Sequence, residues 1–218
     1  MSGARSGGVP DLERSLREAV RGHVSRETLD RLKAHLSLLR KWNAAINLVA
    51  PSTLAEGWDR HIIDSAQVFS CAPQHEGHWI DIGSGGGFPG LVCAIIAKER
   101  APGLEFSFVE SDKRKAAFLS TAVQALDIEA RVLPSRIETL PSQNADIVTA
   151  RALAPLSKLL GLAAPHLAPA GTCIFPKGER HAEELSEARP HWRFKLSQVP
   201  SITGANAVIL VLGEIERV

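Results

Sequence analysis

The chain of 218 residues contains no tyrosine, a single methionine and only 5% aromatic residues. So few aromatic side chains argue against a surface on which successive bases of a single strand would stack. Its three cysteines, Cys71, Cys93 and Cys173, form no CxxC pair, so we expect neither a disulfide framework nor a zinc site, and no metal. Free cysteines that behave as small buried apolar residues are typical of a reducing compartment, so we expect a cytoplasmic protein.

Long apolar runs are also missing. No window approaches the roughly 20 consecutive apolar residues that a membrane span requires, and the start of the chain lacks the apolar core of a secretory signal. The formal net charge is only +1, so no global attraction to polyanions is expected. With 44% apolar and 22% charged residues, the composition is that of a globular domain without membrane contact. No long exposed apolar strand suggests a dimer, so we expect a monomer.

The pattern of apolar residues changes near residue 77. Before it, apolar residues recur at helical spacing, which predicts an N-terminal helical extension over residues 1–76. After it, short apolar runs alternate with helical stretches, which is typical of βαβ units around a parallel sheet. The helices that we predict in the extension are 11–22, capped by Asp11, 25–43, capped by Ser25, and 57–70.

Residues 77–218 contain seven predicted strands. Five of them alternate with helices, and the last two, WRFKLSQV and NAVILVLGEI, are joined by a link too short for a helical crossover. That last pair is therefore antiparallel. The predicted fold is an α/β domain with a seven-stranded, mostly parallel sheet and an antiparallel last strand, preceded by the helical extension.

The segment WIDIGSGGGFPG, residues 79–90, is the most informative, because it follows the first predicted strand and opens a helix. In open α/β sheets a nucleoside-like ligand lies at this strand end, where glycines let the backbone approach it closely. The GxGxxG pattern at 85–90 also fits a dinucleotide. Asp81, two residues before Gly83, separates the candidates: a carboxylate there would repel a pyrophosphate but suits the cationic sulfonium of S-adenosylmethionine. The alternative is that Asp81 caps a turn.

Polar side chains also follow the next three strands. Glu110 ends the second strand, where an acid can accept hydrogen bonds from a ribose diol. After the third strand we expect Ile137 to pack on an adenine ring and Glu138 to face its amino group, although SRIE at 135–138 also fits a capping box. After the fourth strand, Arg151 offers five hydrogen-bond donors to a cofactor carboxylate or to an acceptor on a base.

Further short segments complete an ordered series along nearly the whole chain. In order they are Trp42-Asn43, Asn47-Leu48, RHIIDS at 60–65, the 81–90 loop, Glu110-Ser111 with Lys113-Arg114 and Phe118-Leu119, SRIE at 135–138, RALAP at 151–155 and Lys177-Gly178. The series resembles the bacterial small-subunit ribosomal RNA guanine-N7 methyltransferases, also called the glucose-inhibited division protein B family. The glycine loop alone is unspecific, whereas the ordered set is specific.

The resemblance implies a Rossmann-like class I methyltransferase fold. It also implies methyl transfer from S-adenosylmethionine to N7 of a guanine, position 527 in the 530 loop of 16S rRNA, with the small ribosomal subunit as partner. The cofactor contacts that it implies are Gly83, Phe88, Ile137, Glu138 and Arg151. The arguments from the loop and strand ends add Asp81, Gly85 and Glu110.

The chemistry agrees with this resemblance. N7 of guanine carries a free lone pair and no proton, so its methylation needs alignment of the reacting atoms and no general base. The purine gains positive charge, which carboxylate or amide oxygens can stabilise. The candidate catalytic residues are Asp64, Asn43 and Asn47 in the N-terminal segment, together with Arg151.

Two alternatives remain open from the residues alone. An NAD(P)-dependent oxidoreductase is favoured by GxGxxG and Glu110, but the chain has no tyrosine for a Tyr-x-x-x-Lys pair. A non-catalytic RNA-binding or ribosome-assembly protein would keep a degenerate pocket, and the intact glycine loop argues against that degeneracy.

Overall fold

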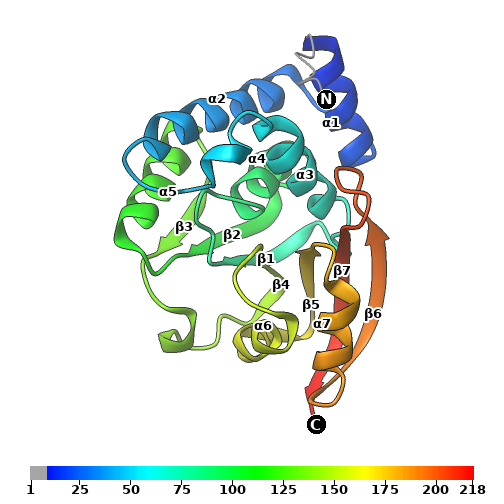
Figure 1. The fold of residues 1–218 in the computed structure, drawn as a ribbon. Coiled ribbons are helices and arrows are strands. Elements are labelled where there is room, and N and C mark those ends of the chain that lie inside the picture. Colours follow the sequence, from blue (N-terminus) through cyan, green and yellow to red (C-terminus); the bar gives the residue numbers. More distant parts are fainter. Residues whose placement is uncertain (1–8) are drawn as a thin grey trace.

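A single sheet of seven strands forms the centre of the computed structural model, which describes residues 9–218 (Figure 1). The strand order is β3-β2-β1-β4-β5-β7-β6. The first five strands pair in parallel, whereas β7 runs antiparallel to both β5 and β6. The prediction of a mostly parallel seven-stranded sheet with an antiparallel last strand is therefore confirmed. The strands are β1 (Glu76–Ile82), β2 (Gly103–Val109), β3 (Ala130–Leu133), β4 (Ala145–Thr149), β5 (Leu167–Lys177), β6 (Trp192–Pro200) and β7 (Val208–Arg217).

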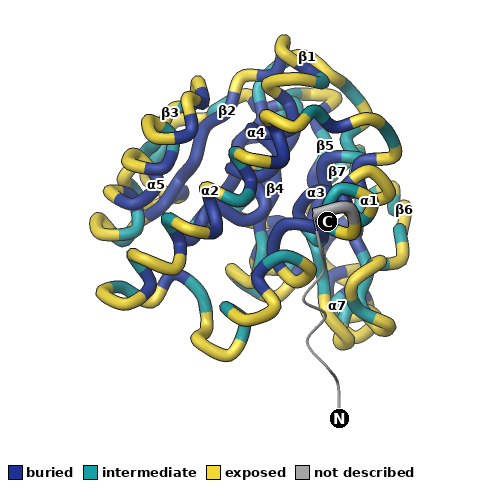
Figure 2. Tube along the Cα trace, turned by 90° about the horizontal axis from the view of Figure 1, so that it is seen from above, coloured by how far each residue is buried: buried dark blue, intermediate teal, exposed yellow. Residues whose placement is uncertain are grey.

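Helices cover both faces of this sheet (Figure 1). The helices up to α5 pack in one apolar cluster, and α6 and α7 pack in a second one across the sheet. Figure 2 shows the central strands β1, β2 and β4 as mostly buried, whereas the edge strand β6 and the outer turns of the helices are largely exposed or intermediate. The α-helices are α1 (Val9–Val20), α2 (Arg26–Asn43), α3 (Asp64–Phe69), α4 (Gly90–Arg100), α5 (Lys113–Ala125), α6 (Leu156–Ala163) and α7 (His181–Ala188).

The second predicted helix forms as its sequence indicates. The Ser25 side chain accepts a hydrogen bond from the backbone N–H of Thr28 and so satisfies a donor that the first turn of α2 leaves free. The first prediction needs a correction. Helix α1 already includes Val9, so Asp11 lies in its first turn and is not its cap. Pro10 fits that position, because a first-turn residue needs no N–H for the helix.

The third predicted helix, 57–70, is helical but not uniform. Its first part, Trp58–Ile63, is a π-helix, which continues into α3. The π-helix ends with His61, Ile62 and Ile63, whose side chains are buried in the interior. The residues of α3 that follow are also mostly buried. Sequence reasoning missed α7, in which only Leu185 and Ala188 are buried, so no long apolar stripe announces it.

The N-terminal helical segment is part of the same core as the sheet. Strand β1 begins at Glu76, one residue before the expected boundary between extension and domain. Apolar side chains of α1, α2 and α3 share one cluster with those of α4, α5 and the strands. The segment is thus an added layer on the sheet domain. None of the described helices is both long and apolar enough to cross a membrane.

Candidate active site

A large hollow lies where the parallel strands β1 and β4 end side by side. Its volume is about 1030 Å³, which is enough for a cofactor-sized ligand. It is lined by the glycine loop after β1, by Glu110 after β2, by Arg151 after β4, and by His61 and Asp64 from the N-terminal segment. This is the crevice at which open α/β sheets bind their ligands.

Glycine is required in this loop because its backbone takes left-handed conformations. Gly83, Gly85 and Gly87 have φ angles of +69°, +51° and +85°. A Cβ on Gly85 would meet only backbone oxygens, at 3.8 and 4.0 Å, so no side chain occupies the space in front of it. Glu110 fixes this part of the loop, because its carboxylate accepts hydrogen bonds from the N–H groups of Gly85 at 2.9 Å and Asp112 at 2.8 Å. Its contact with a ribose remains a prediction.

Asp81 lies beneath the loop and does not line the cavity, which corrects the expectation that it faces the ligand. It is fully buried, and its Oδ1 accepts a hydrogen bond from the hydroxyl of Thr149 at 2.7 Å. A Cβ on Gly90 would lie only 2.7 Å from Asp81 Oδ2, so α4 begins directly against this carboxylate. Burial raises the pKa of Asp81 to about 6, against the lowering effect of the Thr149 hydrogen bond. The geometry favours the alternative in which Asp81 anchors the turn.

A smaller cavity of about 200 Å³ adjoins the first one and contains Ile137 and Glu138. The two cavities share Gly83, Ser111, Leu153 and Ala154. Leu153 covers the glycine, since a Cβ on Gly83 would lie 2.7 Å from its Cδ1. The cavities are thus neighbouring parts of one groove that Leu153 divides. The expected capping box at 135–138 is not formed, because the short helix Ile137–Thr139 has no side-chain cap.

Arg151 links the sheet to the N-terminal segment. It donates hydrogen bonds to the carbonyl of Arg60 at 3.2 Å and to Nδ1 of His61 at 3.1 Å, and it lies 3.6 Å from Asp64 Oδ2. Asp64 also accepts a hydrogen bond from Thr203 in the loop between β6 and β7. Burial lowers the pKa of Arg151, and the Asp64 carboxylate opposes that shift. The structure therefore brings together two of the predicted catalytic residues, Arg151 and Asp64, at the wall of the cavity.

The two predicted asparagines do not reach the cavity. Asn43 is buried, and its side-chain oxygen accepts hydrogen bonds from the N–H groups of Leu48 and Val49. It therefore holds the turn after α2. Asn47 is exposed and lines a smaller surface hollow with Asp112 and Lys115, of which Lys115 also lines the main cavity. Neither asparagine lines the main cavity, and a role beside the reacting base remains a prediction.

Several residues of the site escaped sequence reasoning. Thr203 carried no signal, because nothing in the chain indicates that the loop between β6 and β7 reaches Asp64. Leu153 carried a weak one, as an apolar residue in the RALAP segment. His35 carries a clear sequence signal, because it is a polar residue among the buried leucines of α2.

Phe88 lies at the centre of the polar cluster. It is 4% exposed, and its ring stacks on His61 and on His35 with centroid distances of 4.8 Å in each case. The Arg151 guanidinium lies over the same ring at 4.8 Å, a favourable cation–π distance. Phe88 therefore connects the glycine loop to Arg151 and, through it, to Asp64.

His35 makes stability depend on pH. Burial lowers its pKa from 6.5 to about 4, so between these values the unfolded chain binds more protons than the folded one. Its contribution to stability is therefore complete above pH 6.5 and is lost as the pH falls toward 4. We expect wild type to lose about 2 kcal/mol of unfolding free energy relative to His35→Gln between pH 7.5 and pH 5. Urea denaturation of both proteins at each pH measures this difference, and a constant difference would contradict a neutral, buried His35.

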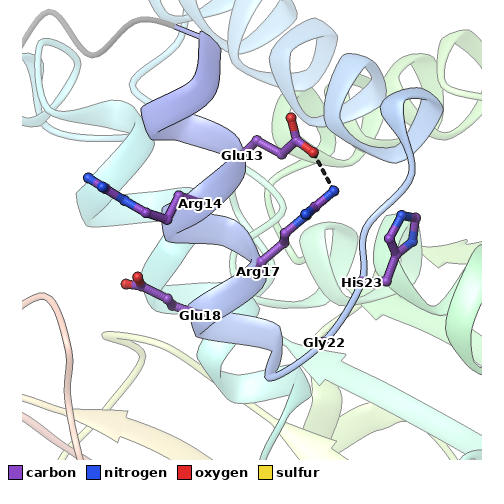
Figure 3. Close-up of a pocket in the computed structure, with 6 residues that line it drawn as sticks. All are labelled: Glu13, Arg14, Arg17, Glu18, Gly22 and His23. Carbon is purple, nitrogen blue, oxygen red and sulfur yellow. Dashed lines mark hydrogen bonds and ion pairs between the residues drawn. The ribbon is translucent and has the colours of Figure 1, made fainter.

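Another hollow, of about 630 Å³, lies on α1 and the turn after it (Figure 3). Figure 3 shows charged side chains around it, and the ion pair between Glu13 and Arg17 lies along the helix surface. Both side chains are at least 39% exposed. This hollow contains no residue of the glycine loop or of the Arg151 cluster. Among the described residues, no group of three or more His, Cys, Asp or Glu side chains is placed to hold a metal ion.

Comparisons with known proteins agree with this arrangement. The family model described as rRNA small subunit methyltransferase G matches residues 28–210. A protein named ribosomal RNA small subunit methyltransferase G from Cereibacter sphaeroides (strain ATCC 17025 / ATH 2.4.3) is 52% identical over 87% of this chain and 91% of its own length. The protein of the same name from Rhodospirillum centenum is 50% identical over 88% of this chain and 87% of its own length.

Solved structures support the fold. A S-adenosylmethionine-dependent methyltransferase from Aquifex aeolicus superposes with a TM-score of 0.55 at 15% identity, over 82% of this chain and 97% of its own. M. jannaschii TYW2 in complex with AdoMet superposes with a TM-score of 0.54 at 12% identity, over 80% of each chain. At such low identity these likenesses concern the architecture alone, which is the class I methyltransferase fold.

Proposed function

The chain belongs to the rRNA small subunit methyltransferase G family, and on this premise we propose that it moves a methyl group from S-adenosylmethionine to N7 of a guanine in the 530 loop of 16S rRNA. One observation carries the proposal. A glycine loop at the end of β1 opens onto a cavity whose wall holds the Arg151–Asp64 pair. None of the three cysteines lines that cavity, so it offers no thiol nucleophile. The enzyme acts on small-subunit rRNA in the cytoplasm, as a monomer.

The residues present fit this cofactor. The open space in front of Gly85 and the left-handed glycines form a cradle that side chains would fill. Gly83, Gly85 and Phe88 would hold the cofactor along the loop, Glu110 its ribose, and Ile137 with Glu138 its base. Asp81 would act from below by anchoring the loop. The bound sulfonium supplies the electrophilic methyl group.

The chemistry required of the protein is then alignment and charge stabilisation. The guanine N7 lone pair needs no base to remove a proton, so neutral His61 has no proton to take. Burial and nearby Arg151 lower the pKa of His61 to about 4, which leaves this imidazole uncharged at neutral pH. The Asp64 carboxylate, held by Arg151 and Thr203, would stabilise the positive charge that the methylated purine gains.

Few basic side chains without an ion-pair partner lie at the cavity among the described residues, so RNA would meet little positive charge there. Arg60 and Lys115 line the cavity without an ion-pair partner among the described residues. Lys177 also lines the cavity, but it is paired with Glu184 at 2.7 Å and its side chain is only 9% exposed. The target guanine must be splayed out of its loop to enter, as for other enzymes that modify bases.

The test is to map the modified nucleotide. We expect the protein to transfer labelled methyl groups to 16S rRNA of unmethylated small subunits at one guanine in the 530 loop, with strand scission after borohydride and aniline marking N7. Subunits that already carry the methyl group are the matched control and should accept none. Calorimetric titration should show binding of S-adenosylmethionine and not of NADH. Methyl incorporation at another nucleotide or atom, or none, would overturn the proposal.

A further inference from the structure

Helix α2 sends one polar side chain into the interior toward the glycine loop. His35 is 0% exposed, whereas the neighbouring buried positions of the same stripe are leucines. Its Nε2 lies 2.9 Å from the carbonyl oxygen of Gly86. The approach is close, because a Cβ on Gly87 would lie only 3.2 Å from that same nitrogen. A helix of the N-terminal segment thus contacts the loop backbone directly.

The surroundings define the protonation state of the imidazole. The Gly86 carbonyl can only accept a hydrogen bond, so Nε2 must carry the proton and donate it. Nδ1 is buried and has no partner among the described residues. A proton on Nδ1 would be an unpaired buried donor, which is costly, so the neutral form with the proton on Nε2 is the stable one. His35 therefore acts as a fixed donor.

The same ring also supports Phe88. The two rings stack at a centroid distance of 4.8 Å with an interplanar angle of 25°, and Phe88 in turn carries the Arg151 guanidinium. His35 does not line the cavity itself. Its two contacts, one with the carbonyl of Gly86 and one with the ring of Phe88, both act on the loop that forms the cavity wall.

We propose that His35 is a positioning residue for cofactor binding: it holds residues 85–88 in the shape that receives S-adenosylmethionine. The inference rests on the proposed use of that cofactor. It gives the N-terminal helical segment a role in cofactor affinity, in addition to any contact with RNA. Burying the polar imidazole of His35 costs free energy, but it provides a hydrogen bond to Gly86 that a leucine at this position could not make.

The test separates the donor from the packing. His35→Leu fills the buried space with an apolar side chain but removes the hydrogen-bond donor. His35→Gln supplies a side-chain amide N–H that can donate to the Gly86 carbonyl. We expect His35→Leu to raise the KM for S-adenosylmethionine at least tenfold with kcat and the KM for RNA within threefold of wild type. His35→Gln should restore the KM to within threefold. Calorimetric titration with S-adenosylmethionine alone should show the same order of affinities.

A second variant controls for stability. Leu32→Ala truncates another fully buried side chain of α2 and should lower the urea midpoint while leaving the KM for S-adenosylmethionine unchanged. The inference is overturned if His35→Leu binds the cofactor as wild type does, or if Leu32→Ala raises the KM as much as His35→Leu. Failure of the proposed function is distinct, because wild type would then not bind S-adenosylmethionine at all.

Discussion

Replacing Arg151 with alanine is expected to lower kcat/KM for methyl transfer to rRNA at least 100-fold, which corresponds to about 2.7 kcal/mol of transition-state stabilisation. The side chain contacts the Arg60 carbonyl, His61 and Asp64 and lies over Phe88. Its removal leaves the Asp64 carboxylate, whose side chain is only 17% exposed, without its cation. A partly buried carboxylate without a partner raises the free energy of the folded state, so we expect the Asp64 side chain to shift toward solvent. Methyl incorporation under steady-state conditions measures the loss.

The matched control is Arg31→Ala. Arg31 is also partly buried, donates to the carbonyl of Leu126 and approaches Asp127, but it lies away from the cavity. We expect this variant to keep at least a third of wild-type activity. Arg151→Lys should not rescue, because a single ammonium group cannot reproduce the several directed contacts of a guanidinium. An Arg151→Ala enzyme with more than a third of wild-type activity would show that the Arg151–Asp64 pair is not part of the reaction.

Replacing Asp81 with alanine is expected to weaken binding of S-adenosylmethionine at least tenfold, which is about 1.4 kcal/mol. The reason is the anchor beneath the loop. Without the carboxylate, the Thr149 hydroxyl loses its acceptor and the start of α4 loses the group against which Gly90 packs. The loop between them is then free to change shape. Calorimetric titration with the cofactor alone measures the effect.

Thr149→Val distinguishes an anchor from a direct contact. Thr149 is fully buried and does not line the cavity, so its hydroxyl can influence affinity only indirectly. It donates to Asp81 and accepts a hydrogen bond from the indole N–H of Trp79 at 2.9 Å. We expect a weakening of threefold or more. Ser107→Ala, which removes another buried hydroxyl, one bonded to His78, is the control and should leave affinity unchanged. If Thr149→Val binds the cofactor normally while Asp81→Ala does not, the anchoring explanation is wrong.

The sequence predicted the candidate site best for residues that directly follow the ends of parallel strands. The glycine loop, Glu110, Ile137, Glu138 and Arg151 all follow strand ends, and parallel strands bring such ends to one edge of the sheet. Their grouping around the two cavities therefore follows from the βαβ pattern. The errors concern side chains whose direction depends on packing. Asp81 lies at a strand end too, yet the tight approach of α4 at Gly90 turns it into the interior.

The N-terminal segment was the harder part, because its helices could be assigned but their placement could not. The spacing RHIIDS gave no indication that a π-helical turn would bury His61 and leave Asp64 facing Arg151, about 90 residues later. Asn43 and Asn47 look alike in sequence. Asn43 holds a turn with its side chain, whereas Asn47 is exposed to solvent.

The amino-acid sequence by itself determined the alternation of strands and helices and the position of the glycine loop. It also determined the family to which the chain belongs. The alternation follows from periodicity and the loop from the conformational freedom of glycine, which both act over a few residues. The family follows from the resemblance carried by the ordered series of short motifs. Only the tertiary structure decided that His35 supports the loop, that Leu153 divides the groove and that Thr203 reaches Asp64. Such contacts join distant segments, and the packing of the whole core selects them.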